Sequence, residues 1–186
     1  MMKRLFILIP VICLCIFGCS KNSSTKLVSA NINKEEGTNF IAEYIKIRYE
    51  GVNTDNIEER YAEQEGFYSV SMRESPLWAN LPDNIDASKR FFESRDYQCQ
   101  ILRNQISSDD NSYRADFSVL YLSNDYAYDC YVDYIIVFEL CEENGIKIES
   151  MNTIKNQTIY IHGAEIHVLP DKVELIYPDI DSDMHE

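Results

Sequence analysis

The sequence is short of positive charge. It carries 17 Lys and Arg residues against 31 Asp and Glu residues, and its formal net charge is −14. A negative field of this size repels the phosphate backbones of DNA and RNA, so nucleic acid is not an expected partner. The same field keeps the folded part away from an anionic membrane surface, so that membrane contact needs another means.

The sequence also lacks an apolar run long enough to cross a bilayer. The longest run extends from Leu5 to Phe17, whereas a membrane-spanning helix needs about 20 apolar residues. There is no glycine-rich phosphate loop, no CxxC pair and no serine in the context of a nucleophile elbow. These absences leave no motif for nucleotide binding, thiol redox chemistry or serine hydrolysis, and no cofactor is expected.

The first residues have the pattern of an export signal. Lys3 and Arg4 precede the apolar run, which ends at Ile16-Phe17-Gly18-Cys19. A charged start, a short apolar segment and a small residue at the cleavage position are typical of a secretory signal peptide. The last four residues resemble the lipobox of bacterial lipoproteins.

This resemblance implies that residues 1–18 are a signal peptide, that the chain is cut before Cys19, and that diacylglycerol is attached to the Cys19 thiol. Two or more acyl chains hold a protein stably on a membrane. We therefore expect an exported protein, lipid-anchored to the outer face of the cytoplasmic membrane or to the outer membrane. The alternative is an ordinary cleaved signal peptide, with Cys19 as a disulfide partner.

The rest of the chain divides into four segments. Residues 19–36 lack apolar periodicity and are expected to form a lipidated, flexible tether. Residues 37–156 are expected to form an α+β domain and residues 157–178 a C-terminal β-hairpin extension. Residues 179–186 are an acidic tail that we expect to fray.

Helical periodicity prevails in the first half of the domain. Helices are predicted over residues 38–51, 54–66 and 84–94, and the apolar side of the first includes Arg48. Asp55 and Glu58 have the spacing of a capping box at the start of the second helix. Residues 67–72 alternate and predict a short strand.

The apolar period changes to two from Tyr97 onward. Four strands are predicted, joined by short polar turns. Matching their apolar faces puts Cys99 opposite Tyr121, and Tyr121 opposite Val132. Helices followed by an antiparallel four-stranded meander indicate an α+β fold, in which the helices lie on one face of the sheet.

Strand geometry also predicts the state of the later cysteines. An exported protein favours a disulfide, but Cys130 and Cys141 fall on opposite faces of one predicted strand. Cys99 lies two strands away from Cys130, beyond the limit of roughly 7 Å between the Cα atoms of a disulfide. We therefore expect Cys99 and Cys130 to be reduced core residues.

The element order over residues 38–155 resembles the nuclear-transport-factor-two-like fold, also called ketosteroid-isomerase-like or cystatin-like. The resemblance implies a cone, in which N-terminal helices close over a curved antiparallel sheet. Proteins of this fold include isomerases, dehydratases, binding modules and accessory proteins of conjugation channels and cell envelopes. The fold alone therefore does not choose a function.

The interior of the cone is expected to be rich in tyrosine. Of the 13 tyrosines in the chain, those expected to face a ligand pocket are Tyr44, Tyr61, Tyr97, Tyr113, Tyr121 and Tyr134. Proton transfer in such a cone needs an inward carboxylate or histidine. Asp116 and Asp133 are out of phase with the apolar face, and no histidine lies between residues 38 and 155.

The leading hypothesis is therefore a non-enzymatic domain in the cell envelope that binds or scaffolds. Its partner is expected to be an envelope protein or a small apolar ligand. A small isomerase or hydrolase that uses the same pocket is the alternative.

A second candidate site lies in the C-terminal extension. A two-residue turn at Gly163-Ala164 pairs His162 with Glu165 and places His162, Glu165 and His167 on one face. Zinc accepts nitrogen and carboxylate ligands, although no fourth ligand is evident. A metal-binding envelope protein is thus a further alternative.

Overall fold

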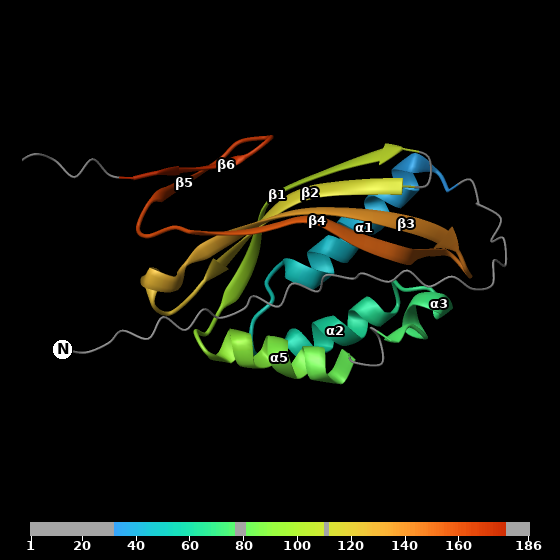
Figure 1. Ribbon diagram of the computed structural model, residues 1–186, viewed down its shortest axis with the longest axis horizontal. Helices are drawn as coiled ribbons and strands as arrows, with labels where there is room; N and C mark the ends of the chain where they lie inside the picture. Colours follow the sequence, from blue (N-terminus) through green and yellow to red (C-terminus); the bar gives the residue numbers. More distant parts are fainter. Residues whose placement is uncertain (1–31, 77–80, 110–111, 178–186) are drawn as a thin grey trace, which may run out of the picture.

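The computed structural model describes residues 32–76, 81–109 and 112–177. The predicted signal peptide, Cys19 and the acidic tail lie outside these ranges. Figure 1 shows an antiparallel sheet with helices on one side and a β-hairpin on the other. This arrangement confirms the predicted α+β class, with a four-stranded meander and an additional C-terminal hairpin.

Helix α1 (Lys34–Tyr49) begins earlier than predicted. The side chain of Asn33 caps the helix, because its Oδ1 accepts a hydrogen bond from the backbone N–H of Glu35 at 2.9 Å. Residues 34–36, which were assigned to the tether, therefore belong to the folded part.

Helix α2 (Ile57–Glu65) follows and ends before Gly66, as predicted. The predicted capping box is wrong, because the residue at the N-cap is Asn56 and its side chain makes no capping bond to the helix. Its Oδ1 instead accepts from the backbone N–H of Asn53 at 2.9 Å. This bond stabilises the loop that leads from α1 into α2.

The strand predicted over residues 67–72 is also absent. The segment forms a short helix, α3 (Val70–Arg73), after a single parallel bridge between Tyr68 and Ile148. Ser69 caps the helix by accepting a hydrogen bond from the backbone N–H of Met72 at 3.1 Å. The carboxylate of Glu143, from the turn after the third strand, accepts from the N–H of Val70.

Helix α5 (Leu81–Glu93) corresponds to the third predicted helix and begins three positions earlier. A short 3-10 helix, η1 (Tyr126–Tyr128), interrupts the connection between the second and third strands. None of the helices in the described part of the chain has the length and apolar character needed to cross a membrane.

The sheet confirms the predicted meander. Its order is β1-β2-β3-β4, with bounds β1 Gln98–Asp109, β2 Ser112–Leu122, β3 Cys130–Glu142 and β4 Ile146–Tyr160. Register shifts occur in the β1–β2 pair after Ile101 and twice in the β3–β4 pair. Such irregularities bend the strands, which fits the expected curvature.

The strand register corrects one prediction and confirms another. Cys99 lies opposite Tyr121, as predicted, but Tyr121 lies opposite Cys130 and not opposite Val132. Cys99 and Cys130 are thus separated by two strand spacings, about 10 Å. Cys99 and Cys130 are free and buried, as expected, and Cys141 is also free and buried.

The two faces of the sheet carry different layers. Val119 and Val132 belong to the main core, which the helices cover, whereas their neighbours Leu120 and Tyr131 pack under the C-terminal hairpin. That hairpin consists of β5 (Glu165–Val168) and β6 (Val173–Ile176). The helices and the hairpin therefore lie on opposite faces of the sheet (Figure 1).

Candidate ligand pocket between the helices and the sheet

A cavity of about 140 Å³ lies between α1, α2 and α5 and the helix-covered face of the sheet. Most of its wall is aromatic or aliphatic, and the polar groups come from the helices. The lining residues are Arg48, Tyr49, Val52, Ile57, Arg60, Tyr61, Gln64, Ser88, Phe91, Phe92, Tyr121 and Tyr134. The interior of the domain is thus partly filled and partly open.

Half of the predicted pocket tyrosines line this cavity. Tyr61 comes from α2, and its hydroxyl is hydrogen-bonded to Ser88 Oγ on α5 at 2.8 Å. Tyr121 and Tyr134 come from β2 and β3, and their hydroxyls are 3.3 Å apart. The aromatic ring of Tyr134 stacks on Phe117, with a centroid distance of 5.0 Å.

The other three predicted tyrosines are packed in the core around the cavity. The hydroxyl of Tyr44 is hydrogen-bonded to that of Tyr68 at 2.8 Å. Tyr97 stacks on Phe91 at 4.8 Å. Tyr113 is fully buried, and its hydroxyl has no partner among the described residues. Tyr44, Tyr97 and Tyr113 therefore point inward, as predicted, but they do not line the cavity.

Arg48 is the site residue that the sequence analysis did not assign. Its Nη1 donates to Gln64 Oε1 at 2.7 Å and to the Tyr44 hydroxyl at 3.4 Å, and its Nε donates to the Tyr49 hydroxyl at 3.2 Å. Helical periodicity had already put Arg48 on the apolar side of the first helix. A cation on that side of an amphipathic helix was the signal for a charged group inside the cone.

The groups around Arg48 are neutral. Burial raises the pKa of the Tyr44, Tyr49 and Tyr68 hydroxyls, so these side chains remain protonated at neutral pH. Burial likewise raises the pKa of Tyr121 and Tyr134 across the cavity. The cavity lining includes no Asp, Glu or His. The site therefore combines the guanidinium ions of Arg48 and Arg60, of which Arg60 is paired with Glu63, with uncharged hydrogen-bonding and aromatic groups.

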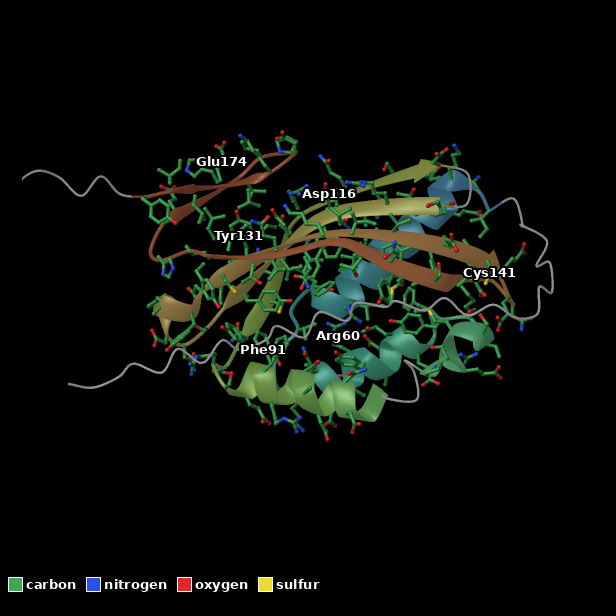
Figure 2. The ribbon with its side chains drawn as sticks, viewed as in Figure 1. Arg60, Phe91, Asp116, Tyr131, Cys141 and Glu174 are labelled. Carbon is green, nitrogen blue, oxygen red and sulfur yellow. The ribbon has the colours of Figure 1, made fainter. Side chains whose placement is uncertain are left out.

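The rim of the cavity is formed by α2 and α5. Figure 2 shows Arg60 and Phe91 on these two helices, on the side that faces the sheet. Arg60 Nη1 is 3.1 Å from Glu63 Oε2, so its charge is paired at the surface. Phe91 lines the cavity and is 38% exposed. The cavity is therefore bounded on this side by side chains that reach solvent.

The carboxylates predicted to point away from the cone do so. Asp116 is paired with Arg103, whose Nε also donates to Ser118 Oγ at 3.1 Å. Asp133 accepts from Ser118 Oγ at 2.6 Å and from Lys155 Nζ at 3.1 Å. This polar network lies on the face of the sheet opposite the cavity, and its hydrogen bonds are made within the sheet.

The strand pairing required by the metal hypothesis is wrong. β5 pairs with β6 and not with the end of β4. His162 lies in the turn with a φ of 49° and stacks on Tyr160, while Glu165 Oε1 is 3.3 Å from His167 Nε2. The described residues contain no group of three His, Cys, Asp or Glu side chains placed to hold a metal ion.

Comparison with known proteins adds little about the site. No protein-family model matches the chain, and no curated protein matches it. A solved IcmL-like type IV secretion system protein from Legionella pneumophila subsp. pneumophila str. Philadelphia 1 is similar to it. The two share 11% sequence identity with a TM-score of 0.46, over 66% of this chain and 93% of that chain. A likeness at this level says nothing about what this chain binds.

Proposed function

We propose that this protein is an exported lipoprotein, anchored through Cys19, whose α+β domain binds a small ligand without converting it. The observation that carries the proposal is the cavity of about 140 Å³ between the helices and the sheet. Ligand sites are typically concave and largely apolar, with a few polar groups that orient the ligand. The aromatic wall and the small set of helix-borne donors fit that description.

The lining residues favour binding over catalysis. General acid–base chemistry needs a group that exchanges protons near neutral pH, and His, Asp and Glu do this most often. None of these lines the cavity. Burial raises the pKa of Tyr49, Tyr121 and Tyr134, which line it, and so keeps these hydroxyls protonated. The isomerase or hydrolase alternative therefore has no base in its favour.

The lipid anchor is supported by the sequence pattern at Ile16-Phe17-Gly18-Cys19. Radiolabelled palmitate fed to cells that express the full chain tests it. We expect label and membrane association in the wild type and in Cys15→Ala, and loss of both in Cys19→Ala. Cys15 is the matched control, since it is a cysteine four residues before Cys19, inside the apolar run. An unlabelled wild-type protein would contradict the anchor.

Binding is tested by ligand-observed NMR with a library of small compounds and the purified protein. Ser88→Leu puts a larger side chain into the cavity wall on α5, whereas Asp86→Leu changes an exposed position on the same helix. We expect to find compounds that bind the wild type and Asp86→Leu but do not bind Ser88→Leu. Unchanged binding to Ser88→Leu, or chemical turnover of a bound compound, would contradict the proposal.

A further inference from the structure

We propose that the cavity takes a small organic acid, and that the guanidinium of Arg48 binds its carboxylate. This inference rests on the proposed binding function and names its ligand class. A guanidinium donates charge-assisted hydrogen bonds to a carboxylate, and these are stronger than hydrogen bonds between neutral groups. The argument has three parts: the unused donors of Arg48, the missing counter-ion, and the size of the cavity.

Arg48 has donors to spare. A guanidinium carries five N–H groups. Gln64, Tyr44 and Tyr49 occupy Nη1 and Nε, while Nη2 has no hydrogen-bond partner among the described residues. The existing bonds hold the side chain in one position at the cavity wall. A carboxylate that entered the cavity would therefore meet a donor group that is already oriented.

The charge of Arg48 also lacks a counter-ion. Within the described part of the chain, no carboxylate oxygen lies within ion-pair distance of it, although the sequence has 31 acidic residues. Arg103, whose side chain is only 9% exposed, is paired with Asp116. The hydroxyls around Arg48 are protonated and supply no negative charge. Arg48 is half-buried, and a cation that is withdrawn from water is ordinarily paired; a bound anion would provide the pair.

A purely structural role explains the position of Arg48 less well than anion binding does. Arg48 is in the last turn of α1, where a cation stabilises the helix dipole, and it lies over the ring of Tyr49 at 5.5 Å. Lys46 is in the same last turn and faces solvent. Lys46 therefore already stabilises the dipole of α1, and because it is exposed it does so without a desolvation cost. Placing a second cation against the cavity needs a further reason.

The size of the cavity limits the acid. An engineered protein cavity of about 150 Å³ is known to hold benzene, and this cavity is close to that size at about 140 Å³. Tyr49, Phe92 and Tyr134 offer aromatic surface to the body of the ligand. The fitting class is a monocarboxylic acid with one ring or a short branched chain.

Benzoate and its neutral isostere benzamide test the inference by calorimetric titration of the purified full-length protein. Hydrogen bonds to charged groups contribute enough that wild-type protein is expected to bind benzoate about 10- to 100-fold more tightly. Arg48→Met is expected to abolish that preference, and Arg48→Lys to keep part of it. Lys46→Met, the matched change at the same helix end, is expected to keep it fully. Circular dichroism checks that each variant is folded.

The outcomes separate the two proposals. Equal binding of benzoate and benzamide by the wild type overturns the role of Arg48 but leaves a ligand-binding cavity standing. Loss of the benzoate preference in Lys46→Met as well overturns it too, because the effect would then be that of total charge. If neither these two compounds nor any of the library binds, the proposed binding function fails together with the inference.

Discussion

The close contact between Gly37 and Tyr113 gives the sharpest test of how α1 is seated on the sheet. Gly37 is buried in the first turns of α1. A Cβ atom at this position would lie 2.2 Å from the Tyr113 hydroxyl oxygen and 2.3 Å from Cζ. Tyr113 has no exposed surface. The change Gly37→Ala therefore requires either the ring or the helix to shift.

The expected cost follows from two opposing effects. Overpacking a tight core costs about 1–3 kcal/mol, and a contact with both a ring carbon and its hydroxyl belongs at the upper end. In the opposite direction, alanine inside a helix is more favourable than glycine by about 1 kcal/mol. The net loss in the free energy of unfolding is then about 2 kcal/mol. For a domain of this size that corresponds to a melting temperature lower by about 4–8 °C.

Urea unfolding followed by circular dichroism measures this loss, and Gly66→Ala is the control. A Cβ at Gly66 would meet its nearest atom, the backbone oxygen of Glu63, at an ordinary 3.6 Å, and the backbone there has a φ of −63°. We expect Gly66→Ala to leave the transition midpoint unchanged or raise it slightly. If Gly37→Ala were as stable as Gly66→Ala, the close packing of α1 against Tyr113 would be refuted.

Two further predictions follow from the buried ionisable side chains. Burial raises the pKa of Tyr97 to about 12, so the folded state holds this proton where the unfolded chain, with a pKa of about 10, has lost it. Tyr97 then adds no pH dependence of stability below about pH 10 and destabilises the folded state as the pH rises toward 12; urea midpoints should fall more steeply across that range in the wild type than in Tyr97→Phe, and equal slopes contradict it. Burial also raises the pKa of Cys130 to about 12 and of Cys141 to about 11, and the thiolate is the reactive form. A thiol reagent at mildly alkaline pH should therefore leave both unmodified in the native protein and label them in urea, and rapid native labelling contradicts their burial.

Much of the sheet was predictable because a strand shows its two faces directly in the sequence. Phe117 and Val119 alternate with polar Asp116 and Ser118, and the structure buries the first pair under the helices. The exact register was less predictable. A shift of two residues leaves every side chain on the same face, so the apolar pattern allowed Tyr121 to be paired with Val132. The loop with η1 selects Cys130 instead.

In residues 67–72, tertiary contacts outweigh the local sequence pattern. Their alternation is that of a strand, but the segment forms α3. Ser69 caps that helix locally, and Glu143, 73 residues away from Val70 in the sequence, accepts its backbone N–H. A cap contributed by a distant turn leaves no trace in the spacing of neighbouring residues. The same applies to the pairing of β5 with β6, which replaces the predicted pairing of strands across the turn at Gly163.

The sequence by itself determined the four strands of the sheet, three of the helices, the inward tyrosines and the outward carboxylates, because period and phase along each segment decide these. Strand spacing added the reduced state of Cys99 and Cys130. Only the tertiary structure decided that Tyr61, Tyr121 and Tyr134 meet at a cavity, and that Arg48 enters it without a counter-ion. Those facts depend on how three helices are seated across two strands. The periodicity of apolar residues within one segment does not show which distant segments that segment contacts.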